Sequence, residues 1–92
     1  MKQFRDADTR SLFAGQRVRR IPPEIRLRAR MRLQRVVAAA ALTDLRIPPS
    51  HRLEALRGDR KGQFSIRIND QWRVCCVWTD QGAMEIEVVD YH

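Results

Sequence analysis

The sequence has few cysteines, few aromatic residues and no long apolar run. Among its 92 residues the two cysteines, Cys75 and Cys76, are neighbours. Successive side chains on a strand point to opposite faces, so these two thiols are poorly placed to bond to each other. With two cysteines, two histidines and no CxxC spacing, the chain also has too few ligands for a zinc cage. We therefore expect reduced thiols, no metal and no cofactor.

The absence of apolar runs bears on location. No stretch approaches the roughly 20 apolar residues that span a membrane. The first residues, Met1 to Asp6, lack the apolar core of a signal peptide. We expect a cytoplasmic protein without a membrane partner. The length and the apolar fraction of 43% predict one globular domain spanning residues 1–92.

Arginine is what the chain has in abundance. Lys and Arg total 18 against 11 Asp and Glu, a net charge of +7, and Lys2 and Lys61 are the only lysines. This excess favours a polyanionic partner, most commonly nucleic acid, and the planar guanidinium suits phosphate. A basic domain without such a partner is the alternative, and a GC-rich genome would also enrich arginine.

The first half of the chain is predicted to be helical. Asp8 or Thr9 is expected to cap a short helix that continues to about Phe13 and ends at Gly15. Pro22-Pro23 then opens a longer helix. Its apolar stripe at helical spacing consists of Ile25, Ala29, Leu33, Val36, Val37 and Ala40. Another face carries Arg28, Arg32 and Arg35, which are either solvated or in contact with RNA or an acidic partner.

After Pro48-Pro49 the pattern changes to period two. A short strand is expected from Leu53 to Arg57, and a second where Phe64, Ile66 and Ile68 alternate with polar residues. Asn69-Asp70 is expected to form a tight turn, because both residues tolerate positive φ. The next strand presents Trp72, Val74, Cys76 and Trp78 on one face, Asp80-Gln81-Gly82 turns the chain, and Ile86 and Val88 mark a last strand.

The predicted fold class is α+β, with two N-terminal helices packed on one face of an antiparallel four-stranded meander. A short N-terminal edge strand is expected at Phe4. The other face of the meander would be open and partly basic. It would carry Ser65, Arg67, Arg73, Cys75, Val77, Val89 and Tyr91.

Three features of the sequence could carry chemistry. The first is the terminal Asp90-Tyr91-His92, which offers a carboxylate, a phenol and an imidazole, or is a frayed polar end. The second is the loop Arg57-Gly58-Asp59-Arg60-Lys61-Gly62, whose glycines would let it approach a phosphate, unless it is simply solvated. The third is Arg73, which would stabilise phosphate charge or else pair with Glu85, Glu87 or Asp70.

Together these residues form a set suited to metal-independent RNA cleavage. That reaction needs a base for the 2′-hydroxyl, cations for the crowded phosphate and an acid for the leaving 5′-oxygen. His51, the other imidazole, follows Pro48-Pro49-Ser50 and is interpreted as a loop residue.

The motifs resemble those of HigB-type toxins of type II toxin–antitoxin modules, in the RelE/ParE superfamily. The matching segments are Arg52-Leu53-Glu54-Ala55-Leu56, Gly58-Asp59-Arg60, Gly62-Gln63-Phe64-Ser65-Ile66-Arg67, Asn69-Asp70-Gln71-Trp72-Arg73 and Asp90-Tyr91-His92. The resemblance implies a RelE-like, microbial-RNase-like fold and an mRNA interferase that cuts translated messages on the ribosome. It also implies a HigA-type helix-turn-helix antitoxin, with operator DNA bound only through the toxin–antitoxin complex.

The resemblance also implies roles for single residues. Asp90, Tyr91 and His92 match the terminal catalytic group, and Arg73 matches the arginine assigned to the phosphate. Glu54 stands where one branch has a catalytic histidine, and could serve as base with His92 as acid. Arg57 stands where some members have lysine, and Arg60, Lys61 and Arg67 complete the predicted substrate-binding set.

One geometric difficulty concerns the terminal group. Strict alternation places Tyr91 with Arg73 but directs Asp90 and His92 to the other face. Either the strand end twists or bulges, or Asp90 positions its neighbours, which is the interpretation we favour. Two other functions remain open: a ParE-like gyrase inhibitor, which needs no acid–base cluster, and a small basic RNA-binding module, for which few aromatic residues are available.

Overall fold

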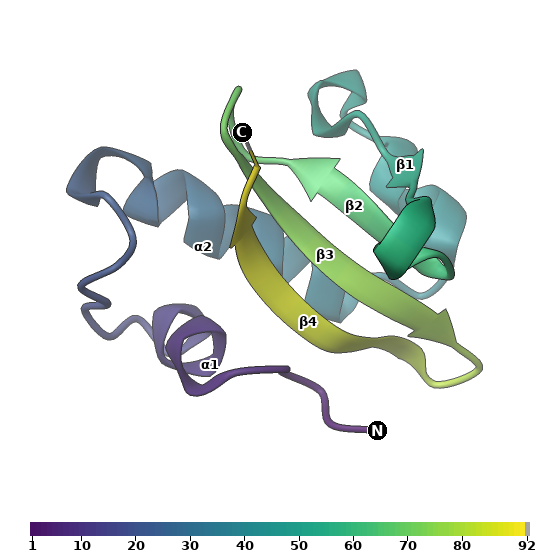
Figure 1. Cartoon of the computed structure of the whole chain (residues 1–92), viewed down its shortest axis with the longest axis horizontal. Helices are drawn as coiled ribbons and strands as arrows, with labels where there is room; N and C mark the ends of the chain where they lie inside the picture. The colour runs from purple at the N-terminus through teal and green to yellow at the C-terminus, as the bar shows by residue number, and fades with distance from the viewer. Residues whose placement is uncertain (92) are drawn as a thin grey trace.

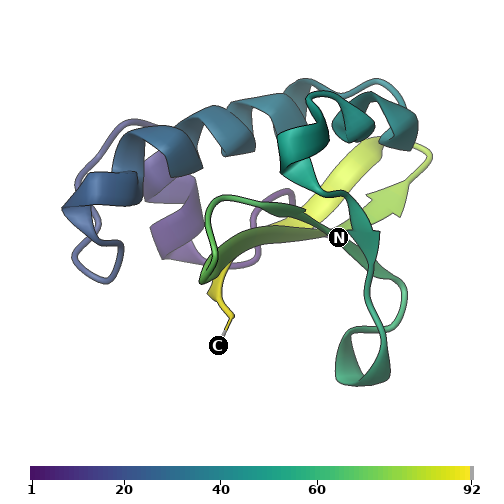
Figure 2. The same ribbon diagram turned by 90° about the horizontal axis from the view of Figure 1, so that it is seen from above.

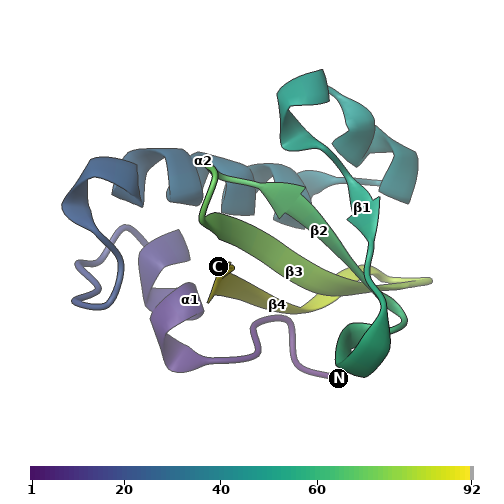
Figure 3. The same ribbon diagram turned by 45° about the horizontal axis from the view of Figure 1, so that its top comes forward.

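The computed structural model describes residues 1–91. It contains α1 (Ala7–Phe13) and α2 (Pro23–Ala38), followed by β1 (Glu54–Ala55), β2 (Gln63–Arg67), β3 (Trp72–Thr79) and β4 (Gly82–Asp90). Three short 3₁₀ turns are η1 (Leu42–Arg46), η2 (Pro49–His51) and η3 (Gly58–Arg60). The strands form a four-stranded antiparallel meander in the order β1-β2-β3-β4 (Figure 3). The predicted α+β class is confirmed.

The helices occupy one side of the sheet. Helix α2 crosses one face, and α1 packs beside α2 and against β4 (Figure 1). The end of the described chain and the η3 turn lie on the opposite side of the sheet (Figure 2). One face of the meander is therefore covered and the other is open. No helix among residues 1–91 is long and apolar enough to cross a membrane.

The short helix begins two or three residues earlier than the capping prediction indicates. Asp6, not Asp8 or Thr9, is the N-cap, and its carboxylate accepts a hydrogen bond from the backbone N–H of Thr9 at 2.6 Å. The Thr9 side chain is buried, and its hydroxyl instead accepts from the backbone N–H of Val88 at 3.1 Å. This contact satisfies a backbone donor on the outer edge of β4, which joins α1 to the sheet.

Helix α2 starts at the predicted prolines and buries the predicted stripe. Ile25, Ala29, Leu33 and Val36 are all in the core. Ala40 is the exception, because the backbone becomes extended at Ala39 and leaves Ala40 exposed beyond the helix. The prediction that Ala40 belongs to the buried stripe is therefore wrong.

The arginine face of α2 is not simply solvated. Arg28 donates to the backbone carbonyl of Ile68 at 3.4 Å, and Arg32 donates to that of Arg67 at 3.0 Å. Burial, together with repulsion from the neighbouring arginines, lowers the pKa of Arg32. Arg28 and Arg32, two of the three arginines on this face, therefore bind and stabilise the connection between β2 and β3.

The covered face of the sheet supplies the rest of the core. Trp72, Val74 and Cys76 are buried as predicted, and Trp78 packs against them half-buried. From the neighbouring strands come Ile66, Ile68, Ile86 and Val88. The period-two pattern therefore predicts the buried face of β2, β3 and β4 correctly.

Three local predictions need correction. The N-terminal edge strand is reduced to one parallel bridge between Phe4 and Ile86, because helix α1 starts three residues later. The first strand is only Glu54–Ala55. The turn at Asn69-Asp70 needs no positive φ, since the Asn69 side chain accepts hydrogen bonds from the backbone N–H groups of Gln71 and Trp72 at 2.9 and 2.7 Å.

A β-bulge interrupts β4, at a place the sequence pattern does not predict. Cys75 is opposite Glu87 and Val77 is opposite Met84, so β4 carries one extra residue there, and Glu85 has φ 51°. The extra residue lets Ala83 and Ile86 both face the core. Beyond the bulge, alternation places Glu87 and Val89 on the open face.

Candidate active site

The strand register gathers the predicted site on the open face. Glu54 lies opposite Ser65, and Ser65 lies opposite Cys75, which is opposite Glu87. The adjacent row consists of Arg67, Arg73 and Val89. Because opposed residues of paired strands share a face, Glu54 and Arg73 belong to the same surface.

Arg73 is held in this surface by neutral oxygens. Its Nε donates to the Ser65 hydroxyl at 2.7 Å, and its Nη2 donates to the backbone carbonyl of Arg52 at 2.8 Å. The predicted alternative, an ion pair with Glu85, Glu87 or Asp70, is wrong, since Arg73 has no carboxylate within 4.0 Å among residues 1–91. Its positive charge is therefore not neutralised by the described part of the chain.

Tyr91 extends the same surface beyond the end of β4. Its backbone N–H donates to the carbonyl of Gln71, and its phenol lies near the Cys75 thiol. Burial, with a further contribution from Cys75, raises the pKa of Tyr91 above its ordinary value. The phenol is therefore protonated near neutral pH and can act as a proton donor.

Glu54 and Tyr91 come from opposite edges of the sheet and face one hollow. The hollow has a volume of about 470 Å³ and is lined by Glu54, Ala55, Leu56, Arg57 and Tyr91. It therefore combines a carboxylate, a cation and a phenol, which are a potential base, a phosphate ligand and an acid.

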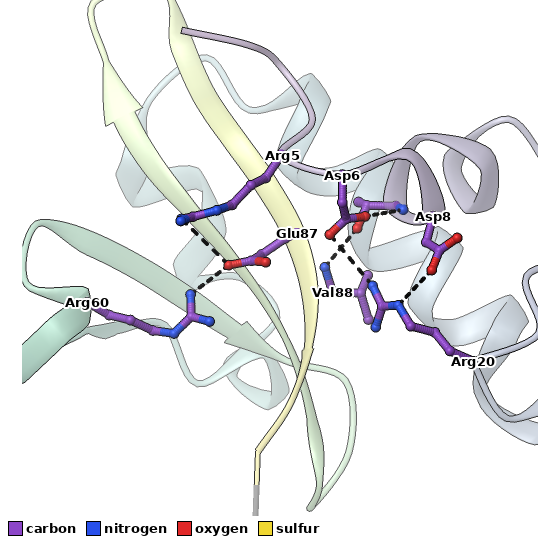
Figure 4. Close-up of polar contacts among 8 residues, drawn as sticks. Arg5, Asp6, Asp8, Arg20, Arg60, Glu87 and Val88 are labelled. Carbon is purple, nitrogen blue, oxygen red and sulfur yellow. Dashed lines mark hydrogen bonds and ion pairs between the residues drawn. The ribbon is translucent and has the colours of Figure 1, made fainter.

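Arg60 is engaged by the protein itself. Its Nη1 donates to Gln63 Oε1 at 3.1 Å and to Glu87 Oε1 at 2.7 Å. Arg5 Nη1 lies 3.8 Å from the same Glu87 oxygen, so Glu87 contacts both arginines (Figure 4). The hydrogen bond to Glu87 raises the pKa of Arg60. This ion pair anchors the η3 turn to the sheet, and the charge of Arg60 is largely offset by Glu87.

The other predicted substrate ligands lie around the hollow and the open face. Arg57 lines the hollow and is exposed, and Lys61 is exposed at the end of η3. Arg67 lies opposite Arg73 and pairs with the exposed Asp70. Arg57 and Lys61 are therefore more accessible to a phosphate than Arg60 or Arg67.

The terminal trio is only partly on this surface. Asp90 lies opposite Trp72 in the register, and its carboxylate accepts from Gln71 Nε2 at 3.0 Å. This contact supports the interpretation that Asp90 positions the strand end. His92 lies outside the described residues.

The sequence pattern did not identify the two groups that hold Arg73. Ser65 was expected on an open surface, but it is 1% exposed. Ser65 lies two residues before Arg67, which is directly opposite Arg73, so Ser65 is a diagonal neighbour of Arg73 on the same face. The period-two alternation of the sequence could have predicted this proximity. Arg52 adopts a left-handed conformation with φ 46° after η2, for which the sequence contains no local signal.

The thiols and the acidic residues do not form a metal site in the described chain. Among residues 1–91 no three His, Cys, Asp or Glu side chains are grouped closely enough to hold a metal ion. Burial raises the pKa of Cys75, and burial with repulsion from Cys75 raises that of Cys76 to about 11. Both thiols are therefore protonated at neutral pH.

Comparison with known proteins identifies the family. Residues 2–92 match the model of the HigB-like toxins, described as the RelE-like toxin of the type II toxin–antitoxin system HigB. Toxin HigB-1 of Vibrio cholerae is 39% identical over 84 residues, which cover 91% of this chain and 81% of that protein. Endoribonuclease HigB of Proteus vulgaris is 27% identical over 92 residues, covering 100% and 99%. The chain with this open, arginine-bearing sheet belongs to the HigB-like family of RelE-like toxins of type II toxin–antitoxin systems.

Proposed function

We propose that this toxin is a ribosome-dependent endoribonuclease that cleaves translated mRNA and inhibits growth until a HigA-type antitoxin neutralises it. One observation carries the proposal: Glu54 and Tyr91 meet at one hollow on the same open face as Arg73, whose charge is uncompensated. The similarity to a protein named Endoribonuclease HigB supports it.

The chemistry assigns each group one step. Glu54, exposed at the hollow, accepts the proton of the RNA 2′-hydroxyl. The 2′-oxygen then bonds to phosphorus, and the bond from phosphorus to the 5′-oxygen breaks, which leaves a 2′,3′-cyclic phosphate. Arg73 stabilises the charge of the crowded phosphate. The leaving 5′-oxygen takes a proton from His92, or from Tyr91, whose raised pKa keeps its phenol protonated.

Exposed cations around the hollow would guide the RNA. Arg57 and Lys61 are accessible for phosphate contacts, and Arg67 lies beside Arg73. Arg60 would reach a phosphate only by exchanging its bond to Glu87, so its main role is to hold the η3 turn in place. The net charge of +7 supports docking on ribosomal RNA in the cytoplasm.

The antitoxin is expected on the helical side. Helix α2 exposes two apolar side chains there, Leu27 at 72% and Met31 at 51%. Beside Leu27 a hollow of about 360 Å³ between α1 and α2 is lined by Arg17, Arg26 and Arg30. An apolar patch bordered by arginines suits an acidic, amphipathic partner segment. Neutralisation would then be indirect, by blocking entry to the ribosome, and operator DNA would be bound through the antitoxin.

Substitution of the phosphate ligand tests the proposed nuclease. Arg73→Ala should lower cleavage of ribosome-bound mRNA by about 10² to 10³-fold and relieve growth inhibition, since it removes a fixed charge from the transition state. Primer extension on a translated message measures cleavage. His92→Ala is the companion variant, and Arg10→Ala, an exposed arginine on α1, is the matched control.

The outcome separates this function from gyrase inhibition. If both the Arg73 and the His92 variants stay fully toxic, the proposal that this site cleaves RNA is wrong. A supercoiling assay with the same preparations would then show whether the chain acts on gyrase.

A further inference from the structure

Arg73 is held differently from the other arginines of the open face that make side-chain contacts. Arg60 is bound by Glu87 (Figure 4). Arg67 is bound by Asp70. Each of these guanidinium groups is offset by a carboxylate. Arg73 is bound by a hydroxyl and a carbonyl, which orient it without cancelling its charge.

The hydroxyl belongs to Ser65, at the centre of the row that links β1, β2 and β3. Ser65 is 1% exposed, so its Oγ is shielded from water. A water molecule therefore cannot easily replace Arg73 as the hydrogen-bond donor to this Oγ. Its partner strands place Glu54 on one side and Cys75 on the other. The distance of 2.7 Å from Arg73 Nε to Oγ is that of a strong charge-assisted hydrogen bond.

The carbonyl belongs to Arg52, at the C-terminal end of η2. Its backbone N–H closes that turn on the carbonyl of Pro49 at 3.0 Å, and its left-handed φ of 46° redirects the chain. The Arg52 carbonyl accepts from Arg73 Nη2 at 2.8 Å. The two acceptors engage Nε and Nη2, and Nη1 has no partner within the described chain, so it can bind a phosphate oxygen.

We infer that Ser65 is a positioning residue of the site, which aligns the Arg73 guanidinium with the scissile phosphate while preserving its full charge. This inference rests on the proposed nuclease function. A guanidinium aligned beforehand stabilises a transition state without first reorganising, whereas a mobile one must be ordered during the reaction. A carboxylate in place of Ser65 would also align Arg73, but it would weaken the attraction for phosphate.

A double-mutant cycle tests whether Ser65 acts through Arg73. Ser65→Ala should lower the single-turnover cleavage rate on ribosome-bound mRNA about tenfold, with little change in the half-saturating ribosome concentration. In the Arg73→Ala background the same substitution should change the residual rate less than twofold. Ser65→Cys, which nearly conserves volume but has a weak acceptor, should behave like Ser65→Ala.

Thr9→Val is the matched control. Thr9 is also buried and also hydrogen-bonded through its hydroxyl, but to the backbone of β4 away from the hollow. Its effect on cleavage should be equal with and without Arg73. If Ser65→Ala lowers the rate as much in the Arg73→Ala background as in the wild type, Ser65 acts through general stability and the inference is overturned.

A second readout does not depend on cleavage. The Nε–H of Arg73, assigned by its loss in Arg73→Ala, should exchange with water at least tenfold faster in Ser65→Ala and Ser65→Cys than in the wild type. Unchanged exchange overturns the inference. If the wild type cleaves no RNA, the proposed nuclease function fails, and the exchange rates alone decide whether Ser65 holds Arg73.

Discussion

At the residue scale, charge compensation distinguishes the arginines of the open face. Arg73 is the least compensated of those that make side-chain contacts, because its two acceptors are neutral. Arg60, on the η3 turn, is bound by Glu87 and Gln63 instead. From the sequence, Arg60 and Arg73 are both predicted to bind phosphate. The structure assigns them different tasks, since a carboxylate within 2.7 Å largely offsets the charge of Arg60.

The role of Glu54 leads to a prediction for a single residue. Glu54→Gln keeps the size and hydrogen-bonding ability of the side chain but cannot accept a proton from the 2′-hydroxyl. We expect the cleavage rate on ribosome-bound mRNA to fall by about 10² to 10⁴-fold with unchanged ribosome binding. Glu24→Gln, in the first turn of α2, is the control. A Glu54→Gln enzyme with the wild-type rate would exclude Glu54 as the base.

At the element scale, short segments place the site as much as the regular strands do. Turn η2 contributes the Arg52 carbonyl, and η3 carries Arg60 and is anchored by Glu87. These turns are predictable as loops from proline and glycine but not as parts of a site. Their positions depend on contacts with β2 and β4, which the local sequence does not encode.

A buried histidine ties η2 to the core and predicts a pH dependence. His51 is fully buried, its Nδ1 contacts the carbonyl of Leu45 at 3.2 Å, and its Nε2 has no hydrogen-bond partner among residues 1–91. Burial lowers the pKa of His51 below the ordinary 6.5, and Arg32 and Arg35 act in the same direction. His51 therefore lies in a connecting turn as expected, but its side chain is part of the buried interior, which the sequence did not predict.

The consequence for stability has a definite sign. Below about pH 6.5 the unfolded chain binds a proton at His51 that the folded chain does not, so the free energy of unfolding should fall as pH decreases. His51→Gln cannot be protonated and should lose less stability between pH 7.5 and pH 5. Urea denaturation of both proteins at the two pH values measures this. Equal losses would show that His51 does not contribute to acid sensitivity.

At the scale of the whole molecule, the two sides of the sheet are proposed to serve different partners. The open side carries Glu54, Arg73 and Tyr91, and the helical side carries the exposed Leu27 and Met31. The covered core separates them (Figure 2). An antitoxin on the helical side would therefore leave the cleavage groups uncovered.

This separation predicts that binding and cleavage can be uncoupled. Replacing both Leu27 and Met31 by Ser should weaken the affinity for a HigA-type antitoxin by about tenfold or more, since both side chains lose apolar burial. Cleavage by the free toxin should be unchanged. Calorimetric titration with the antitoxin measures affinity, and Gln81→Ser, at an exposed position between β3 and β4, is a control. Unchanged affinity would favour direct neutralisation over Arg73.

The sequence by itself determined the order of the elements, the buried faces and the family. Those features depend on local periodicity, on punctuation by proline and glycine, and on contiguous motifs such as Asn69-Asp70-Gln71-Trp72-Arg73. Only the tertiary structure decided which arginine of the open face keeps its charge uncompensated. The contacts that decide it join Arg73 to Arg52 and Arg60 to Glu87, across 21 and 27 residues, and they exist because sheet pairing brings those strands and turns together.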